Sequence, residues 1–234
     1  MSLNRWQRTN ARASQGERLV VVVPVRGLRG SKTRLRDFFD EQERVALTAA
    51  MLRHVLSAVR DAALADRIAV VTPDPAVVSA LSSPPQGIEV VRQPERQNGL
   101  NSALLIGRGW AAGLGADAML VLSADLPLLR PEHVRALVAQ EAPVIIATDR
   151  HGTGTNGLLL REPLAEAFTF SFGEQSALRH VAEADRLGLN VVRVETPGTA
   201  FDLDTPDDWA SLPHDVQHSL LPARRGVMET TSCP

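Results

Sequence analysis

Residues 18–24 read Arg-Leu-Val-Val-Val-Val-Pro, and this run sets the architecture expected of the whole chain. Four consecutive valines without polar alternation are typical of a strand that is covered on both faces, as in a parallel sheet between layers of helices. From this point onward, apolar runs alternate with helical patterns, which indicates βαβ units. We therefore predict an α/β fold with a mainly parallel central sheet flanked by helices, its crossovers right-handed by default.

The strand and helix patterns can be followed along most of the chain. Predicted strands cover residues 18–24, 68–71, 88–91, 119–123, 144–147, 157–160 and 191–194. Predicted helices cover residues 41–59, 100–112, 134–138 and 174–187, with one more around Trp209. Asp40 followed by Glu43 is typical of a capping box, which marks the start of the first helix.

Length and composition favour one globular domain. The chain has 234 residues, of which 44% are hydrophobic and 22% charged. A single α/β domain fits this length better than two. We predict that residues 17–212 form the domain and that residues 1–16 and 213–234 are flexible tails that carry no chemistry.

The same numbers disfavour several classes of function. The longest apolar run, Leu19–Val25, is far shorter than the roughly 18 residues that span a bilayer. Residues 1–17 contain no apolar segment that could serve as a signal peptide. The one cysteine, Cys233, permits no intramolecular disulfide or cysteine-based metal site, and a net charge of −2 argues against nucleic acid as the main partner. We expect a cytoplasmic protein that binds small anions, with neither a membrane nor a nucleic acid as its partner.

A basic loop, residues 25–35, follows the first predicted strand and holds four cations and two glycines. In doubly wound sheets, ligands bind beyond the C-terminal ends of the strands, where this loop must lie. Glycine lets the backbone approach a ligand, and Arg and Lys donate charge-assisted hydrogen bonds, so the composition suits phosphate. The loop is not a Walker A motif, because Arg26 and Ser31 stand where that pattern needs glycine. The alternative is a solvated basic loop without a ligand.

Acidic residues follow two other predicted strands. Asp125 ends an apolar strand and is expected to point into the same crevice as the basic loop. Asp202 and Asp204, two positions apart in an extended segment, face the same way and could share a metal. Mg²⁺ is the expected reason for such carboxylates, since it binds one or two of them together with substrate phosphates. The alternatives are a turn at Asp125 and a helix N-cap at Asp204 or Thr205.

Three further polar clusters are candidates: residues 99–101, 152–156 and 172–176. In the first, Asn101 could face a base from the start of a helix. The other two offer backbone amides, hydroxyls and a helix N-terminus, which suit a carboxylate or a phosphate. Each cluster is equally compatible with a hairpin or a helix cap. His54, His133 and His180 fall on helices without a second ligand at metal spacing, so we interpret them as surface or core residues.

Several of these motifs together resemble one family. They are Pro24-Val25-Arg26 with Lys32-Thr33-Arg34-Leu35, Thr72-Pro73-Asp74, Gly99-Leu100-Asn101, Ser123-Ala124-Asp125-Leu126-Pro127, Gly152-Thr153-Gly154-Thr155, and Phe172-Gly173 with Ser176. In this order, from about residue 18 to residue 212, they are similar to the phospholactate or phosphoenolpyruvate guanylyltransferases of deazaflavin coenzyme F-420 biosynthesis. The resemblance implies a single-domain nucleotidyltransferase fold, Rossmann-like and of the GT-A type. Related molybdenum-cofactor and isoprenoid enzymes carry a Gly-x-Gly-x-Arg loop that residues 26–34 replace here.

The resemblance also implies roles for individual residues. Asp125 and Asp202 would hold Mg²⁺; Arg26, Lys32, Arg34 and Asn101 would contact GTP; and Thr155, Gly173 and Ser176 would bind the phosphorylated acid. Lys32 is counted with the two aspartates among the catalytic residues. Ala124 and Asn156 depart from the family's usual pattern, and neither is expected to contact a proposed ligand residue.

The implied reaction is in-line attack of the acceptor phosphate on the α-phosphorus of GTP, with release of pyrophosphate. Since the acceptor phosphate is already ionised near neutral pH, positioning and charge neutralisation replace a strong general base. The acid is left open among phosphoenolpyruvate, 2-phospholactate and 3-phosphoglycerate. The rival interpretations are a nucleotidyltransferase acting on a sugar phosphate or a molybdopterin, and a non-catalytic nucleotide-binding regulator. The product is expected to pass to the next enzyme of the pathway, and the sequence is compatible with a homo-oligomer.

Overall fold

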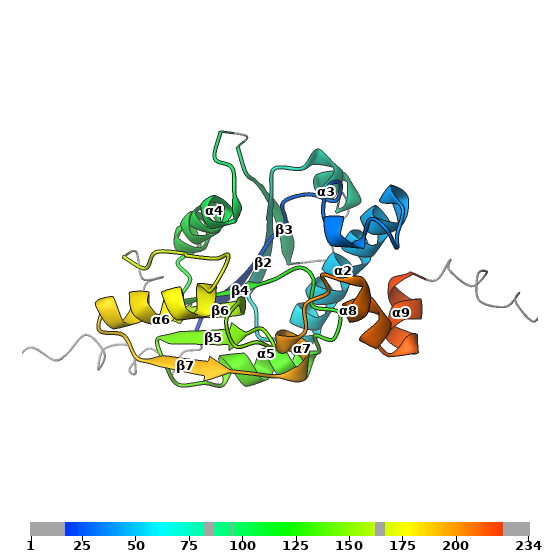
Figure 1. The fold of residues 1–234 in the computed structure, drawn as a ribbon. Coiled ribbons are helices and arrows are strands. Elements are labelled where there is room, and N and C mark those ends of the chain that lie inside the picture. Colours follow the sequence, from blue (N-terminus) through cyan, green and yellow to red (C-terminus); the bar gives the residue numbers. More distant parts are fainter. Residues whose placement is uncertain (1–16, 82–86, 95, 162–166, 222–234) are drawn as a thin grey trace, which may run out of the picture.

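The computed structural model describes residues 17–81, 87–94, 96–161 and 167–221, so the predicted tail at residues 1–16 lies outside the described residues. Within these ranges, seven strands form one sheet with helices on both faces (Figure 1), which confirms the predicted α/β class. The strands are β1 (Leu19–Pro24), β2 (Arg67–Thr72), β3 (Ile88–Arg92), β4 (Ala118–Leu122), β5 (Val144–Thr148), β6 (Thr155–Arg161) and β7 (Val191–Val194).

Helices connect and cover these strands. They are the 3-10 turn η2 (Thr33–Leu35), α2 (Glu41–Ala62), α3 (Pro75–Ala80), α4 (Leu100–Gly113), α5 (Pro131–Val138), α6 (Ser176–Arg186), α7 (Pro197–Ala200), α8 (Pro206–Ser211) and α9 (His214–Leu220). The predicted capping box opens α2, since Glu43 N donates to Asp40 Oδ1 (2.8 Å) and Asp40 N donates to Glu43 Oε2 (3.0 Å). None of the helices in the described part of the chain combines the length and apolarity that crossing a bilayer requires.

The sheet is mainly parallel, as predicted, with one antiparallel strand. Its order is β3-β2-β1-β4-β6-β5-β7, and β6 runs antiparallel to both β4 and β5. Leu122, at the end of β4, pairs with Gly157 near the start of β6, and Ser123 N donates to Asn156 O (2.9 Å). Consequently, the beginning of β6 lies at the same edge of the sheet as the C-terminal ends of the parallel strands.

The packing of β1 explains its unbroken valine run. All four valines are fully buried. Val21 and Val23 lie on the face covered by α2 and α5, while Val20 and Val22 lie on the face covered by α4 and α6. On the second face, Gly107 of α4 approaches so closely that a Cβ would lie 2.7 Å from Val22 Cγ1. A strand with helices on both sides needs an apolar residue at every position.

The C-terminal boundary was predicted too early. Residue 213 was expected to begin a flexible tail, but α9 forms there and Leu220 packs against Trp209 in a small third core with Phe39. The helix is stabilised because Leu220, which is 4% exposed, leaves water for this cluster. Residues 222–234 lie outside the described residues.

Candidate active site

Lys32 lies between two carboxylates at the C-terminal edge of the sheet. Its Nζ is 2.5 Å from Asp125 Oδ2 and 2.8 Å from Asp204 Oδ1, and 8% of its side chain is exposed. Burial alone would lower the pKa of Lys32, but the two carboxylates outweigh burial, so the net pKa is raised. Its left-handed backbone (φ 53°) is costly for a non-glycine residue and is typical of functional sites. The structure therefore brings a charged lysine of the basic loop onto acids from two later segments.

Arg34 occupies the rim of this cluster. Its side chain is 74% exposed, and Nη1 lies 3.8 Å from Asp204 Oδ2. An exposed pair at this distance contributes little to stability. Arg34 is therefore available to a ligand at the edge of the site, whereas Lys32 is enclosed by the acids.

Asp202 adds a third carboxylate next to those of Asp125 and Asp204. The hydrogen bond from Leu203 N to Asp125 O (3.1 Å) joins the two acidic segments. Burial raises the pKa of Asp202, and the neighbouring carboxylates of Asp125 and Asp204 raise it further. Asn156 Nδ2 approaches Asp202 Oδ1 at 3.5 Å. The expectation that Asn156 would contact no proposed ligand residue is therefore wrong, because the antiparallel β6 carries it to this edge.

This cluster has the donor chemistry for a divalent cation. The negative charges of its three carboxylates outnumber the positive charges of Lys32 and the more distant Arg34. Within the described ranges, no group of three or more His, Cys, Asp or Glu side chains is arranged to hold a metal by itself. The residues fit an ion that takes one or two carboxylates and completes its shell with substrate and water oxygens, as Mg²⁺ does. Asp125, Asp202 and Asp204 are the carboxylates that could hold such an ion.

The helix-cap alternative is confirmed for Thr205 and not for Asp204. Thr205 is the N-cap of α8, and its hydroxyl accepts from Asp208 N (3.2 Å). Asp208 in turn accepts hydrogen bonds from the backbone N–H groups of Asp204 (2.9 Å) and Thr205 (2.7 Å). The Asp204 carboxylate is thus not the cap and is left to pair with Lys32.

The basic loop is anchored to the fold. Asp74, which follows β2 and caps α3, accepts hydrogen bonds from Leu28 N (2.9 Å) and Ala76 N (2.8 Å). Gly27 lies against the same carboxylate, where a Cβ would be 2.9 Å from Asp74 Oδ2. Ser31 Oγ donates to Leu28 O (2.8 Å). The middle of this loop is therefore fixed by the fold, while its binding of a ligand stays a prediction.

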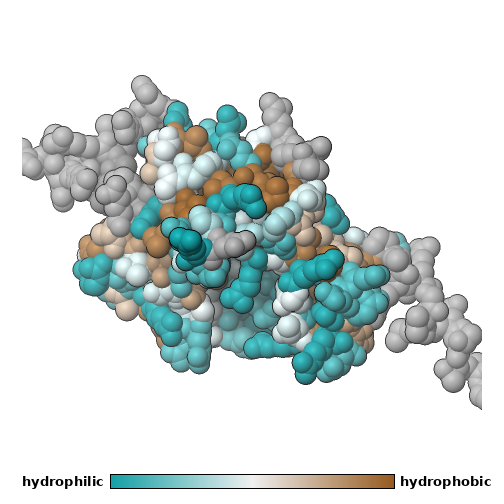
Figure 2. Space-filling model, turned by 90° about the horizontal axis from the view of Figure 1, so that it is seen from above, coloured by the Kyte–Doolittle hydropathy of each residue, from teal (hydrophilic) through white to brown (hydrophobic). Residues whose placement is uncertain are grey.

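A pocket of about 350 Å³ opens between the basic loop and the start of α4. It is lined by Pro24, Val25, Arg26, Pro73, Gln93, Asn98, Gly99, Leu100 and Ala103. Gln93 is buried, and its Nε2 donates to Gly99 O (3.0 Å) and to Gln97 O. These bonds fix the turn that leads into α4. Figure 2 looks down on this side of the molecule, where hydrophilic residues surround a band of apolar ones.

Of the pocket-lining residues, the sequence analysis had assigned a ligand contact to Arg26 alone, although Pro24, Val25, Pro73, Gly99 and Leu100 lie in its quoted motifs. Pro24 ends β1, while Pro73 and Gln93 directly follow β2 and β3. Their position in the sequence could have identified them, because the first residues after neighbouring parallel strands line the crevice of such a sheet. Apolar and amide side chains carry no charge motif, and so they were missed.

Asn101 follows the pocket-lining Leu100, but its amide is engaged elsewhere. Its Oδ1 accepts from Phe172 N (2.9 Å), and its Nδ2 donates to Phe172 O (3.3 Å). Both amide atoms thus bind the backbone of Phe172, and the contact of Asn101 with a base stays a prediction. Asn101 ties the start of α4 to the loop before α6.

The predicted acceptor residues lie where β6 begins and α6 begins. Ala177 N donates to Thr153 O (2.9 Å) and holds these two segments together. Thr155 and Ser176 are nearly buried, at 6% and 2% exposure. Gly173 has φ 124°, a conformation that side chains rarely adopt. The three residues therefore lie where the starts of β6 and α6 meet, a region supplied with hydroxyls and backbone amides.

The loop that precedes β6, residues 149–154, will be called the acceptor loop. Asp149 Oδ1 accepts from Thr153 N (2.9 Å) and from His151 N (3.2 Å). A Cβ on Gly154 would lie 2.7 Å from Asp149 Oδ2. The acceptor loop is therefore shaped by its own first residue.

Arg150 connects the acceptor loop to the acidic segment. Its Nη2 lies 2.6 Å from Asp208 Oδ1, and its guanidinium stacks over the ring of Phe201, 4.9 Å from the centroid. Since Asp208 also holds the backbone of Asp204, a displacement of the acceptor loop is transmitted to the acids. The sequence analysis missed Arg150, which lies in no motif.

The three histidines behave as interpreted. His54 bonds Leu129 O (2.8 Å), His133 caps the start of α5 through Arg130 N (3.1 Å), and His180 is fully buried.

Comparison with known sequences points to one family. A profile described as "Guanylyl transferase CofC like" matches residues 19–214. The phosphoenolpyruvate guanylyltransferase of Rubrobacter xylanophilus is 47% identical over 194 residues, which cover 82% of this chain and 91% of that protein. The phosphoenolpyruvate guanylyltransferase of Sphaerobacter thermophilus is 38% identical over 195 residues, with the same coverage. The 3-phospho-D-glycerate guanylyltransferase of Phenylobacterium zucineum is 36% identical over 192 residues, covering 80% of this chain and 86% of that protein.

Solved structures share the fold at lower identity. A nucleotidyl transferase from Methanothermobacter superposes with a TM-score of 0.63 at 21% identity, covering 88% of this chain and 99% of that one. A CMP:2-keto-3-deoxy-manno-octonic acid synthetase superposes with a TM-score of 0.56 at 16% identity, covering 82% and 95%. These similarities confirm the predicted nucleotidyltransferase fold.

Proposed function

Since the chain belongs to the family of CofC-like guanylyl transferases, we propose that it transfers GMP from GTP to a phosphorylated three-carbon acid and releases pyrophosphate. The observation that carries this proposal is the Lys32 cluster, which joins the basic loop, next to the pocket, to the acids at the same edge of the sheet as the start of β6. A donor bound at the pocket and an acceptor bound at the start of β6 would meet at the acids. The proposed setting is the coenzyme F-420 pathway in the cytoplasm, where GTP is available.

The nucleotide side consists of the pocket and the basic loop. Its apolar and amide lining suits a flat base, and the pocket opens next to Arg26. Lys32 and Arg34 follow along the same loop toward the acids, and we propose that they bind the phosphates that extend from the base, with Arg34 at the rim and Lys32 between the acids. Gly30, with φ 69° and open space where a Cβ would lie, allows the backbone to approach those phosphates.

The acceptor side is built from Thr155, Gly173 and Ser176. Hydroxyls and backbone amides at a helix N-terminus suit a small anion, and they offer no surface for stacking a pterin. Thr155 and Ser176 are nearly enclosed, which limits the acceptor to a small molecule. The relatives are named for two such acids, phosphoenolpyruvate and 3-phospho-D-glycerate.

Asp125 and Asp202 would hold the metal, for which we propose Mg²⁺. The bound ion would neutralise charge on the triphosphate during transfer. Asp204 keeps Lys32 at the acids, and Asn156 keeps Asp202 in place. The protein's own contribution to the reaction is then to bind the two substrates in line and to surround the transferring phosphoryl group with fixed positive charge.

The acceptor phosphate attacks the α-phosphorus of GTP, and pyrophosphate leaves from the opposite side. The nucleophile is already ionised at neutral pH, so no residue has to remove a proton from it. The product joins GMP to the acid through a diphosphate bond, and we propose that the next enzyme of the pathway consumes it. Self-association of the chain remains a prediction.

The test is pyrophosphate release by the purified full-length chain with Mg²⁺. GTP, ATP, CTP and UTP are each paired with phosphoenolpyruvate, 2-phospholactate, 3-phosphoglycerate or a hexose 1-phosphate, and the products are identified by mass. We expect release with GTP and at least one three-carbon acid, and none with GTP alone. Preference for the hexose phosphate, or for another nucleotide, would overturn the proposal.

A further inference from the structure

His180 has both of its ring nitrogens engaged inside the protein. It lies on α6 and is fully buried. Its Nε2 is 3.0 Å from Ser171 N, and its Nδ1 is 3.1 Å from Thr155 Oγ1. A backbone N–H can only donate, so Nε2 must be the unprotonated acceptor. A neutral imidazole carries one proton, and that proton therefore sits on Nδ1 and is donated to the Thr155 hydroxyl.

This arrangement determines whether the Thr155 hydroxyl donates a hydrogen bond to a ligand or accepts one from it. A hydroxyl has one proton to donate and lone pairs to accept with. Because His180 already fills an accepting position, Thr155 keeps its own proton for another partner. In the other tautomer, Thr155 would have to donate to Nδ1 and would present an oxygen lone pair to a ligand. That would repel an anion.

His180 also links the two segments of the acceptor side. Through Nε2 it holds the backbone of Ser171, two residues before Gly173. The ring contacts Phe172 edge-on, with centroids 4.8 Å apart. Ser176 lies one helical turn before His180 on α6. One buried ring thus sets the hydroxyl of Thr155 and the loop that carries Gly173.

We propose that His180 is a positioning residue that makes the Thr155 hydroxyl a hydrogen-bond donor to the phosphorylated acid. The inference rests on the proposed function, since it assumes that Thr155 faces the acceptor. Burial lowers the pKa of His180 to about 4, against a smaller opposing effect of Glu183, so the ring stays neutral at physiological pH. The neutral ring is the condition that the tautomer requires.

The first measurement is long-range ¹H–¹⁵N NMR of the wild-type protein, which reports the tautomer of each histidine without any substitution. We expect the His180 signals of the Nδ1-protonated form. The Nε2-protonated form would overturn the proposal, whatever the kinetics show.

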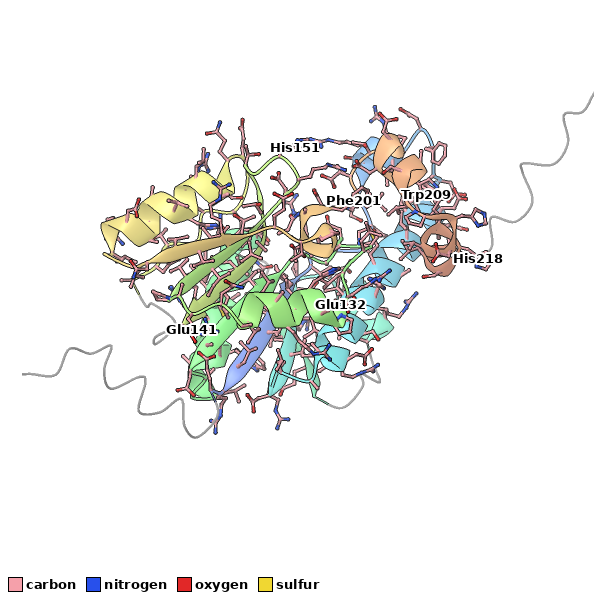
Figure 3. All side chains as sticks on the ribbon, turned by 90° about the horizontal axis from the view of Figure 1, so that it is seen from below. Glu132, Glu141, His151, Phe201, Trp209 and His218 are labelled. Atoms are coloured by element: carbon pink, nitrogen blue, oxygen red, sulfur yellow. The ribbon has the colours of Figure 1, made fainter. Side chains whose placement is uncertain are left out.

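The second measurement compares KM for the acid and for GTP in two variants. His180→Asn keeps an amide N–H near the position of Nδ1, whereas His180→Gln keeps an acceptor near the position of Nε2 and loses the donor to Thr155. We expect His180→Gln to raise KM for the acid about tenfold or more and to change KM for GTP less than twofold, with His180→Asn closer to wild type. His218→Gln on α9 is the control, since Figure 3 shows His218 at the opposite end of the molecule from α6.

The third measurement separates positioning from a general effect on packing. In a Thr155→Val background, His180→Gln should add less than a twofold further change in KM for the acid, because the hydroxyl it acts on is gone. Independent, multiplying effects would overturn the proposal, as would equal losses for GTP and the acid. If the wild type transfers GMP to none of the three acids, the proposed function fails first and this inference fails with it. If the wild type is active and His180→Gln retains its KM values, this inference alone is overturned.

Discussion

The basic loop and the acceptor loop are held by the same device, but the residue that holds each comes from a different place. In both, an aspartate accepts hydrogen bonds from backbone N–H groups, and a glycine packs against its carboxylate. Asp74 reaches the basic loop from the end of a neighbouring strand, whereas Asp149 is the first residue of the acceptor loop itself. The basic loop is therefore held by a residue that the pairing of β1 with β2 brings to it, whereas the turn of the acceptor loop is closed by a residue of the loop itself.

Substitution of the acids shared by the nucleotide and acceptor sides should have the largest effect on turnover. Asp125→Asn and Asp202→Asn are expected to lower kcat by on the order of a hundredfold to a thousandfold, because each removes charge from where the transferring phosphoryl group is stabilised. Turnover measured over a series of Mg²⁺ concentrations checks this. Near-normal activity of either variant at limiting Mg²⁺ would remove that residue from the ligand set.

Thermal unfolding provides the control for these variants. Asp202→Asn should melt at the wild-type temperature or above it, since it relieves repulsion from Asp125 and Asp204. A lower melting temperature would mean that the lost activity reflects lost folding.

Lowering the pH should affect the acceptor side more than the nucleotide side, because His180 belongs to the acceptor side. Its pKa of about 4 in the folded state lies below the ordinary value of 6.5, so the unfolded chain binds the proton more readily. The resulting stabilisation of the folded state is fully present above about pH 6.5 and is lost as the pH falls toward 4. The free energy of unfolding decreases by about 3 kcal/mol in all. Urea unfolding at a series of pH values measures it.

His54 and His133 also have pKa values lowered by burial, so His180→Gln is needed to isolate the effect. The variant should show a shallower loss of stability between pH 6.5 and 4. An unchanged slope would assign the acid sensitivity to the other two histidines. Glu183, whose pKa its bond with Arg186 lowers to about 2, contributes only below its ordinary value of 4.5.

Lys32→Ala tests the nucleotide side. A lost charge-assisted bond to phosphate costs about 1.5 to 3 kcal/mol, which corresponds to roughly a tenfold to hundredfold loss in kcat/KM for GTP. Arg29→Ala is the matched control, because Arg29 is an exposed cation of the same loop. Equal effects of the two substitutions would mean that the loop acts by general charge rather than through Lys32.

The two anchors should give smaller effects that differ in kind. Asp74→Ala and Asp149→Ala each leave backbone donors without their acceptor, at a cost of about 1 to 3 kcal/mol in the free energy of unfolding. We expect Asp74→Ala to raise KM for GTP and Asp149→Ala to raise KM for the acid. Kinetics at saturating concentrations of the other substrate measure both. A shared effect on both KM values would erase the proposed distinction between the two sides.

The glycines sharpen the same comparison. Gly27→Ala and Gly154→Ala introduce a Cβ at 2.9 Å and 2.7 Å from the respective carboxylate, so either the loop or the aspartate must move. Each should be tolerated better when its aspartate has been replaced by alanine. Double-mutant cycles of thermal stability reveal this as a positive coupling within each pair. Additive losses would show that the close approach is not the cause.

The features that could be predicted from the sequence are those set by local residues rather than by distant partners. The valine run of β1 and the capping box of α2 are local patterns, and the structure confirmed both. The reversal of β6 and the packing of α9 depend on distant partners, so periodicity could not reveal them. In the site, Lys32 and the aspartates were found because charge stands out after apolar strands. Gln93 and Arg150 were missed because their importance lies in what they contact.

The pairing of β1 with both β2 and β4 has a consequence for the order of folding. Leu19 pairs with Ala118, nearly a hundred residues further along, while β1, β2 and β3 pair with their nearest neighbours in the chain. Contacts of high sequence separation form slowly, because a long loop must close first. As the chain leaves the ribosome, the unit that contains the pocket can assemble before Asp202 has been synthesised. We expect the nascent protein to acquire its nucleotide pocket early and its catalytic competence last.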